Sequence, residues 1–445
     1  MIFAQFVDDA LGCASYVVGD EAAEAAVVVD PAFAIEQYIE EADKRAVRLV
    51  RTIETHTHAD HLSGHGRLAL ERDVPVSIHL AAEVMYPHDA MEDGEEIVLG
   101  NIVLRCIHTP GHRPEHCCLA VIDRSRAPEP WLVLTGDSLF VGDAARPDLA
   151  VEAREGAEGL FHSLRRVVEL GDGVEVYPGH VAGSLCGKAM SSKASTTIGF
   201  ERRFNPALAY TDVALFVAET AAIAAPRPPN MERIVALNRG PFVGAQPDPP
   251  ELETPPEASQ VLDVRPVTAF ARGHLPGALS VPVSGTRFST KAAFVLDPDR
   301  PVVVAAADEA EAGDALRGLR SVAVRDIPGY VLGGGSETME IVSVDALDAL
   351  LQDGAELIDV REKDERDTGY IAGSRNIPYR LLALGGDDLP RDRPLVTICE
   401  TGPRAAIAAS ILAARGYDAR AVADGGVYAW QAAGKPTVEF RRCGS

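Results

Sequence analysis

The stretch His56-Thr57-His58-Ala59-Asp60-His61 follows residues 47–54, a run rich in strand-forming side chains. Side chains at i and i+2 of an extended backbone share a face, so His56 and His58 can converge on one point. Imidazole and carboxylate groups are the usual protein ligands of zinc and iron. The stretch therefore predicts a metal site at the end of a strand.

Three further residues of the same kinds follow later strands and turns. They are His112 in Thr-Pro-Gly-His, Asp137 in Leu-Thr-Gly-Asp and His180 in Tyr-Pro-Gly-His. Functional side chains of α/β folds gather in loops that follow strands. One loop histidine is explained as an ordinary polar residue, but this whole set is not. The candidate set is His56, His58, Asp60, His61, His112, Asp137 and His180.

Around these residues, short apolar runs alternate with helical patterns. Strands are expected over 26–30, 47–54, 74–79, 102–108, 131–135 and 174–177. Helices are expected over 32–46, 62–72, 152–170 and 207–225. Strands that alternate with helices indicate a layered α/β domain.

Prolines and glycines mark the expected domain boundaries. Five prolines lie within 247–256, and a stiff, helix-breaking segment of this kind places a boundary near 240–257. The triplet Gly333–Gly335 marks a second boundary.

An internal repeat lies beyond the first boundary. Residues 262–282 (LDVRPVTAFARGHLPGALSVP) match residues 358–378 (IDVREKDERDTGYIAGSRNIP) at an offset of 96 without gaps. A second match, Arg300-Pro301 with Arg393-Pro394, has an offset of 93. This period is too long for a solenoid unit, so the pattern predicts a duplicated small domain.

The histidine and aspartate pattern over roughly residues 1–230 resembles the metallo-β-lactamase fold. The resemblance implies an αββα sandwich with metal at one edge, and we place this domain at 1–240. In the di-zinc hydrolases of the fold, the matching residues His56, His58 and His112 hold one metal. Asp60, His61 and His180 match the ligands of the other metal, and Asp137 matches the bridging residue.

A second branch of the same fold, the persulfide dioxygenases, implies a different use of the pattern. One Fe(II) is then held through His56, His112 and Asp137, a facial triad that leaves positions open for substrate and O₂. The other four residues, His58, Asp60, His61 and His180, would orient the ligands or hold substrate. Residues 136–148 resemble this branch, and Arg146 is our candidate for binding the thiol substrate, with a loop-bracing role as the alternative.

Several cysteines lie in the same region. Residues 177–187 resemble the variant of this family that is fused to sulfurtransferase domains, which makes Cys186 a candidate for holding a thiol or persulfide. A small buried packing residue is the alternative for Cys186. The other cysteines, Cys13, Cys106, Cys117 and Cys118, lie in strand-like apolar runs and are interpreted as packing residues.

The last repeat holds Cys399-Glu400-Thr401-Gly402-Pro403-Arg404 between an apolar strand and an apolar helix. Backbone N–H groups at such a turn stabilise an anion and lower the pKa of a thiol. The loop resembles the C-x-x-G-x-R loop of rhodaneses, which implies that Cys399 is the sulfur-transfer nucleophile and that Gly402 and Arg404 shape its cradle. We place this active domain at 338–440.

Two features modify this reading. An acid at Glu400 weakens a positive cradle, which favours a low-molecular-weight persulfide over thiosulfate as the donor. In the middle repeat, placed at 257–335, Ala306 stands where Cys399 stands and Glu311 where Arg404 stands. The middle domain is therefore expected to lack sulfurtransferase chemistry and to serve as a spacer or dimerisation module.

Composition limits the other functions. The 445 residues include 42 basic and 66 acidic ones, a net charge of −24 that disfavours nucleic acid and anionic membranes as partners. Seven cysteines at irregular spacing do not make a disulfide framework and favour a reducing cytoplasm. The first residues lack the pattern of a signal peptide, and no membrane span is expected.

Two hypotheses follow for this αββα sandwich with two rhodanese-like α/β domains. The first is a dioxygenase with one Fe(II) per chain that oxidises a thiol persulfide with O₂ to sulfite. Sulfane sulfur then moves through a Cys399 persulfide, with thiosulfate as a product, in sulfide detoxification. The alternative is a glyoxalase-II-like thioester hydrolase with two zinc ions. A homo-oligomer is expected in either case.

Overall fold

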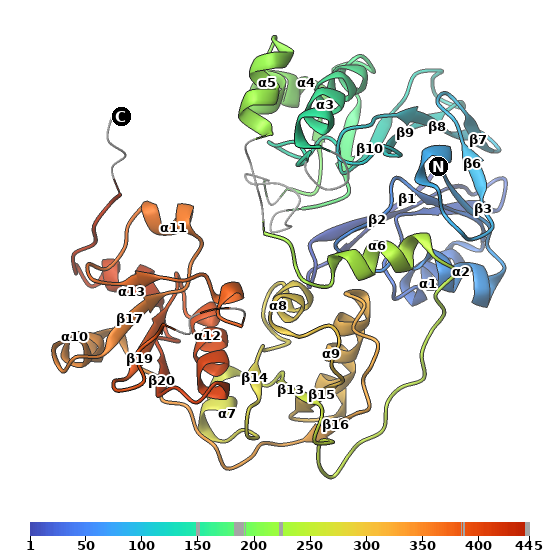
Figure 1. Cartoon of the computed structure of the whole chain (residues 1–445). Coiled ribbons are helices and arrows are strands. Elements are labelled where there is room, and N and C mark those ends of the chain that lie inside the picture. The colour runs from blue at the N-terminus through green and yellow to red at the C-terminus, as the bar shows by residue number, and fades with distance from the viewer. Residues whose placement is uncertain are drawn as a thin grey trace. The chain divides into compact units, whose positions relative to one another are not determined.

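The structure is a computed structural model that describes residues 1–147, 152–181, 191, 193–221, 226–383, 385 and 388–440. The chain divides into two compact units, residues 1–247 with 320–323 and residues 248–319 with 324–445. Their colours run from blue to green and from yellow to red in Figure 1. Within the described residues, no helix is both long enough and apolar enough to cross a membrane.

The first unit contains two sheets in its described residues. The first sheet has the order β1-β2-β3-β4-β5-β6, and the second has the order β12-β11-β10-β9-β8-β7. The first sheet consists of β1 (Ile2–Asp8), β2 (Cys13–Asp20), β3 (Ala25–Val29), β4 (Arg48–Glu54), β5 (Val76–His79) and β6 (Asp89–Met91). The second consists of β7 (Glu96–Leu99), β8 (Ile102–His108), β9 (Cys117–Asp123), β10 (Leu132–Gly136), β11 (Glu175–Pro178) and β12 (Thr196–Thr197).

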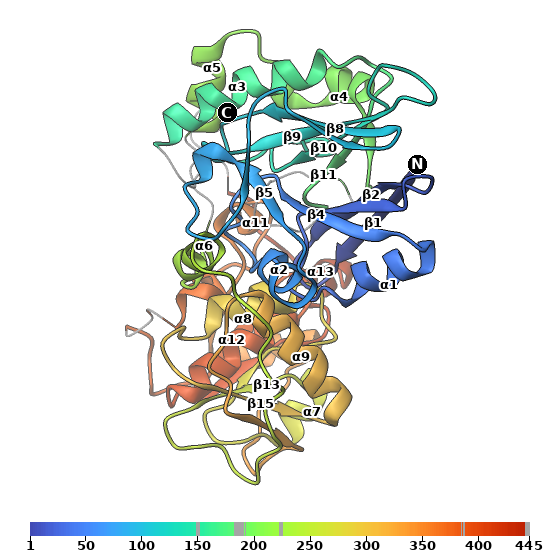
Figure 2. The same cartoon turned by 90° about the vertical axis from the view of Figure 1, so that its right-hand side faces the viewer.

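Helices cover the outer faces of the two sheets. They are α1 (Glu36–Arg45), α2 (His65–Arg72), α3 (Ala153–Val168), α4 (Ile198–Phe204), α5 (Val213–Thr220) and α6 (Met231–Arg239), with short 3-10 turns η1 (Leu80–Ala82) and η2 (Pro206–Leu208). Figure 2 shows the layers edge on, with α3 and α5 on one side of the sheets and α1 and α2 on the other. This is the αββα sandwich that the sequence predicts.

The alternation of side chains explains the layers. Val27 and Val29 of β3 belong to the core between the sheets, whereas Val28 packs with Tyr38 of α1 and Leu68 of α2. Neighbouring strand residues point to opposite faces, so a continuous valine run supplies both cores. Cys117 and Cys118 divide in the same way, one into the core between the sheets and one into the core beneath α3. The packing interpretation of these two cysteines is confirmed.

The prediction of one continuous helix over 207–225 is wrong in the described residues. The chain instead forms η2 and, after a break, α5. The side chain of Asp212 accepts a hydrogen bond from the backbone N–H of Leu215 at 2.9 Å and so begins a separate helix. Residues 222–225 lie outside the described part of the chain.

The described residues of the second unit form two parallel sheets, each from one repeat. Their orders are β14-β13-β15-β16 and β18-β17-β19-β20. The middle repeat has β13 (Gln260–Asp263), α7 (Val267–Arg272), β14 (Leu279–Ser280), α8 (Phe288–Val295), β15 (Val302–Ala306), α9 (Glu309–Ser321) and β16 (Gly329–Leu332). The last repeat has α10 (Val344–Gln352), β17 (Glu356–Asp359), α11 (Lys363–Asp367), β18 (Arg375–Asn376), η3 (Tyr379–Leu381), β19 (Leu395–Ile398), α12 (Pro403–Ala414), β20 (Ala419–Ala421) and α13 (Gly426–Ala432).

Strand register shows that the two repeats are equivalent. Asp263 lies opposite Ala305 in the middle repeat, and Asp359 lies opposite Ile398 in the last repeat. Ala306 comes directly after the residue that pairs with Asp263, and Cys399 comes directly after the residue that pairs with Asp359. The two residues therefore occupy equivalent positions in the two repeats. The chain also joins the middle sheet before residue 257, since the N–H of Leu252 donates to the carbonyl of Tyr330 at 2.7 Å.

Candidate functional site

Three candidate ligands, in the loops that follow β4, β8 and β10, lie close together. His112 Nε2 lies 3.5 Å from Asp137 Oδ2, and His56 Nε2 lies 4.0 Å from the same oxygen. One donor atom from each of the three residues lies within 4.8 Å of the other two, and all three side chains are buried. Asp137 Oδ2 has no hydrogen-bond partner in the described part of the chain. A buried carboxylate oxygen without a partner, facing two imidazole nitrogens, fits a metal ion.

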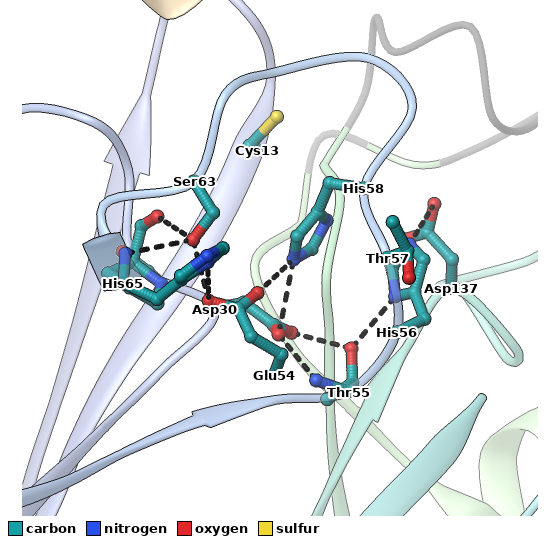
Figure 3. Close-up of polar contacts among 12 residues, drawn as sticks. Cys13, Asp30, Glu54, Thr55, His56, Thr57, His58, Ser63, His65 and Asp137 are labelled. Atoms are coloured by element: carbon teal, nitrogen blue, oxygen red, sulfur yellow. Dashed lines mark hydrogen bonds and ion pairs between the residues drawn. The ribbon is translucent and has the colours of Figure 1, made fainter. Parts of the chain in front are cut away.

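Hydrogen bonds on the far side of each imidazole fix its orientation. The Nδ1–H of His56 donates to Thr55 Oγ1 at 2.9 Å, and that hydroxyl donates to Asp30 Oδ2 at 2.8 Å (Figure 3). The Nδ1–H of His112 donates to the backbone carbonyl of Arg146 at 3.1 Å. Both histidines thus present Nε2 toward Asp137, which is the arrangement that metal-ligating histidines adopt.

The protonation states suit metal binding. Burial lowers the pKa of His56 well below its usual value, and the neighbouring His58 and His112 lower it further. Burial alone would raise the pKa of Asp137, but His180 and His112 hold it below its usual range. The site therefore presents a neutral imidazole at His56 and an ionised carboxylate, the forms that ligate metals.

His58 lies in a separate cluster with two carboxylates. Its Nε2 is 3.0 Å from Glu54 Oε2 and 3.3 Å from Asp30 Oδ1 (Figure 3). Burial would lower the pKa of His58, but Asp30 and Glu54 raise it well above its usual value. His65 and Ser63 complete the network by donating to Glu54 Oε1 at 3.2 and 2.6 Å.

The sequence interpretation missed Asp30 and Glu54 as parts of the site. Asp30 ends the valine run of β3, and Glu54 is the last residue of β4 before the histidine motif. An acidic residue at the carboxyl end of a strand is the one signal that marks each of them.

The sequence interpretation also assigned Cys13 wrongly, as a packing residue. Its Sγ lies 3.2 Å from Asp60 Oδ2, 3.5 Å from His61 Nδ1 and 3.2 Å from His180 Nε2. Burial raises the pKa of the Cys13 thiol well above its usual value, and Asp60 raises it further. Cys13 is therefore a residue of the candidate site, whereas Cys106 packs between the sheets as expected.

His180 connects this cluster to the first one. Its Nδ1–H donates to Asp137 Oδ1 at 2.7 Å, and its Nε2 lies 2.8 Å from Asp60 Oδ2. The candidate residues of the sequence thus come together at one edge of the two sheets. Cys186 lies outside the described residues, so its role stays a prediction.

The second unit holds a separate thiol site in the turn between β19 and α12. The backbone N–H of Gly402 donates to Cys399 Sγ at 3.1 Å, and Cys399 is buried. Gly402 has φ of +116°, and a Cβ there would lie 2.0 Å from the carbonyl oxygen of Ala423. Only glycine fits this turn, which aims the start of α12 at the sulfur.

Known protein families match both regions. Residues 8–180 match the metallo-beta-lactamase superfamily, and residues 248–337 and 343–433 match the rhodanese-like domain. The chain is a metallo-beta-lactamase superfamily protein with two rhodanese-like domains. The resemblances to the metallo-β-lactamase fold and to rhodaneses are thereby confirmed.

Individual relatives of the metallo-beta-lactamase domain carry different activities in their names. The bovine protein named persulfide dioxygenase ETHE1, mitochondrial, is 29% identical over 228 residues, which cover 50% of this chain and 82% of that protein. A probable polyketide biosynthesis zinc-dependent hydrolase, BaeB, from Bacillus velezensis is 27% identical over 192 residues, covering 42% and 80%. A metallo-beta-lactamase crystal structure from Staphylococcus aureus matches with a TM-score of 0.69 and 28% identity, covering 75% of this chain and 99% of that one.

In the second rhodanese-like domain, both charged residues near the loop are paired. Arg404 forms a two-pronged ion pair with Glu365, at 2.6 and 2.7 Å. The Glu400 carboxylate accepts from Arg361 at 2.7 Å. Because Arg361 balances Glu400, this acid opposes the anion cradle less than the sequence alone suggests.

Proposed function

We propose that this protein is a persulfide dioxygenase joined to a sulfurtransferase. The first domain would oxidise a low-molecular-weight thiol persulfide with O₂ to sulfite, using one Fe(II). The last domain would carry sulfane sulfur as a Cys399 persulfide. The observation that carries the proposal is the buried cluster of His56, His112 and Asp137, together with its fusion to a rhodanese-like cysteine loop.

The donor set fits a two-histidine, one-carboxylate iron site. His56, His112 and Asp137 would hold an Fe(II) ion, which would supply open coordination positions for a persulfide sulfur and O₂. His56 and His112 present Nε2 because Thr55 and the Arg146 carbonyl hold their Nδ1–H groups. Arg146 is itself buried beside the site, and we propose that its guanidinium binds the anionic substrate.

The overall oxidation balances without a further co-reactant. A persulfide RSSH, one O₂ and one water give RSH, sulfite and two protons. The chain's own residues position the substrate and hold the ligands in their metal-binding protonation states. The thiol that carries the sulfur is a small molecule, for which glutathione persulfide is a suitable probe.

The sulfur-transfer step is a displacement at sulfur. The Cys399 thiolate attacks the outer sulfur of a persulfide donor, the S–S bond of the donor breaks, and the donor thiolate leaves. The resulting Cys399 persulfide is held near the Gly402 N–H. Attack by sulfite on its outer sulfur forms thiosulfate and returns the Cys399 thiolate, so both sites handle the same sulfur species.

A di-zinc thioester hydrolase is the second candidate for the first domain. In the described residues, the ring atoms His58 Nδ1 and His61 Nε2 lack hydrogen-bond partners, so two more nitrogens are available as ligands. Zinc ions held there would lower the pKa of a bound water and supply it as a nucleophile. The named zinc-dependent hydrolase relative is consistent with this candidate.

Metal analysis and O₂ uptake separate the two candidates. The full chain is purified without chelator, its metals are quantified, and O₂ consumption is followed after glutathione persulfide is added. One iron per chain is the expected result, with sulfite and thiosulfate together formed in an amount equal to the O₂ consumed. Asp137→Ala is expected to lose iron and O₂ uptake together, whereas Cys399→Ser keeps both. Two zinc ions, no O₂ uptake and hydrolysis of a glutathione thioester would establish the hydrolase instead.

A further inference from the structure

Two arginines beside the thiol loop of the last domain are both paired with carboxylates of that domain. Arg404 forms its two-pronged ion pair with Glu365, at 2.6 and 2.7 Å. Arg361 is shared between Asp359, at 2.8 Å, and Glu400, at 2.7 Å. These five side chains together carry one more negative charge than positive charge. They therefore give an approaching anion no net attraction.

The helix α8 of the middle domain carries two cations at its start. Arg287 directly precedes α8, and Lys291 lies in its first turn. The backbone N–H of Lys291 donates to the carbonyl of Arg287 at 3.0 Å, which closes that turn. The Nζ of Lys291 donates to the carbonyl of Thr286 at 2.6 Å. The ammonium is therefore held at the start of the helix, close to the arginine.

The face of α8 that carries Lys291 contacts the last domain. Phe294 lies three residues after Lys291, so the two side chains share a face of the helix. The ring of Phe294 lies 6.3 Å from the ring of Tyr379, in an edge-on arrangement. Tyr379 is buried, and its N–H donates to the carbonyl of Val360 at 3.1 Å. Val360 precedes Arg361, the partner of the thiol loop, so this face of α8 packs against the segment that supports the loop.

The charges of α8 act on the groups of the thiol site. Burial lowers the pKa of the Lys291 ammonium, Arg287 and Arg404 lower it further, and Cys399 opposes them. Burial raises the pKa of the Tyr379 hydroxyl, whereas Arg404 and Arg287 lower it. Charged groups shift one another's pKa when they lie close together. Cations of both domains therefore surround the thiol.

The two cations of α8 are available to a ligand. Within the described residues, neither Arg287 nor Lys291 forms an ion pair with a carboxylate. Arg287 is exposed and Lys291 is partly buried, so a small ion can reach them from solvent. Cations that line an accessible site raise the local concentration of anionic reactants. The middle domain thus supplies the positive charge that the paired arginines of the last domain do not.

We propose that Arg287 and Lys291 of the middle domain bind the divalent sulfur oxyanion that reacts at Cys399. Sulfite held there attacks the outer sulfur of the Cys399 persulfide, the S–S bond breaks, thiosulfate leaves and the Cys399 thiolate is restored. The two cations offset the repulsion between the dianion and the persulfide. This reaction rests on the proposed sulfurtransferase function, whereas binding of the oxyanion does not.

Thiosulfate binding without turnover tests the site directly. The full chain with Cys399→Ser is titrated with thiosulfate at low ionic strength and followed by isothermal titration calorimetry. Adding Arg287→Gln and Lys291→Met should weaken binding by at least about 10-fold. Arg317→Gln removes an arginine of α9 that is 63% exposed, and this control should leave the affinity unchanged. The proposal is overturned if Cys399→Ser does not bind thiosulfate, or if its affinity is the same with and without the two changes in α8.

Turnover gives the second measurement, in chains that keep Cys399. With glutathione persulfide as donor, Arg287→Gln combined with Lys291→Met should raise the KM for sulfite by at least about 10-fold. Transfer to cyanide, which carries at most one negative charge, should stay within about twofold of the wild type and so show that the last domain is folded. An equal loss with both acceptors would overturn the proposal. If the wild type transfers no sulfur but its thiosulfate binding depends on the two cations, the proposed function fails and the oxyanion site stands.

Discussion

The hydroxyl of Thr55 joins a candidate ligand to a buried carboxylate. It accepts the Nδ1–H of His56 at 2.9 Å and donates to Asp30 at 2.8 Å. Thr55→Val keeps the side-chain shape but removes both hydrogen bonds, so His56 loses the partner that fixes its ring and its tautomer. We expect iron affinity to fall by about 10- to 100-fold, the usual effect of losing an outer-shell partner. Iron content after dialysis against a graded series of chelator concentrations measures it.

Thr52 is the matched control for this change. It lies on the same strand, β4, and is fully buried, but its Oγ1 has no hydrogen-bond partner in the described part of the chain. Thr52→Val removes an unsatisfied hydroxyl, so stability should be unchanged or slightly higher and iron affinity unchanged. Equal iron affinities in Thr55→Val and Thr52→Val would show that Thr55 does not orient His56.

Local sequence was sufficient to find the candidate metal ligands but not the residues that support them. The histidine motif and the later His112, Asp137 and His180 follow strands, and each strand run is readable from apolar side chains alone. Cys13 was misplaced because an apolar strand context describes its backbone correctly and says nothing about the partner of its sulfur. That partner is set by the pairing of residues 12–14 with 179–181, a contact between distant parts of the chain.

At the scale of elements, the turn before α12 depends on one glycine. Gly402 has φ of +116°, and a Cβ there would lie 2.0 Å from the carbonyl oxygen of Ala423. Gly402→Ala must displace this turn and with it the N–H that faces Cys399. We expect loss of sulfur transfer by at least about 100-fold, since the cradle of the anion is lost. A cyanide-acceptor assay measures the transfer, and O₂ uptake by the first domain should be unchanged.

Gly416, at the other end of the same helix, separates strain from function. It also has a positive φ, +80°, but the nearest atom to an added Cβ is the Arg391 guanidinium at 3.7 Å. Gly416→Ala should cost about 1 to 2 kcal/mol of stability from left-handed strain and leave sulfur transfer near the wild-type value. If both glycine variants lost transfer equally, destabilisation rather than loop geometry would be the cause.

The limits of element prediction have a physical origin. Strands β8 and β10 were placed to within a residue because uninterrupted apolar runs must be buried. The expected helix over 207–225 failed because helical periodicity continues through Asp212, whereas the carboxylate of Asp212 caps a new helix there. A side chain that hydrogen-bonds to the nearby backbone competes with the hydrogen bonds of a continuous helix. Hydrophobic periodicity records only the spacing of apolar residues, so it does not detect this competition.

At the scale of the whole molecule, the two repeats share a scaffold, but the middle repeat lacks the loop cysteine. Arg265 pairs with Asp263 and with the Gly273 carbonyl in the middle domain. Arg361 makes the same contacts with Asp359 and Gly369 in the last domain.

Restoring the thiol tests how much of the site is missing. Ala306→Cys places a sulfur at the position of Cys399, but Glu311 stands in place of the arginine, and its carboxylate occupies the loop by accepting from the Ala307 N–H at 2.6 Å. We expect this change, made together with Cys399→Ser, to give under about 1% of wild-type transfer, because an acid in the cradle raises the pKa of the thiol. Transfer near the wild-type level would show that the cysteine alone was lost from the middle domain.

Within the second unit, the two rhodanese-like domains touch. The N–H of Ser280 donates to Ser410 Oγ at 3.0 Å in a buried contact, and the rings of Phe294 and Tyr379 lie 6.3 Å apart. Phe294 belongs to α8, and Tyr379 begins η3. The middle domain therefore contacts the last domain through α8 and through the strand that holds Ser280.

Lys291, on that same α8, brings a positive charge toward the thiol site. Burial lowers the pKa of its ammonium, Arg287 and Arg404 lower it further, and Cys399 opposes them. We expect Lys291→Met to reduce kcat/KM for sulfite several-fold, because attack on the Cys399 persulfide brings two anions together. Because the pKa of Lys291 is lowered, its ammonium loses its proton at a lower pH than an exposed lysine does. The wild type should therefore lose this rate advantage as the pH rises through that range, and Lys291→Met should show no such decline.

Lys363→Met, which removes a lysine whose side chain is 71% exposed, is the control and should leave the pH profile unchanged. Identical pH profiles for Lys291→Met and Lys363→Met would show that the middle domain has a purely structural role.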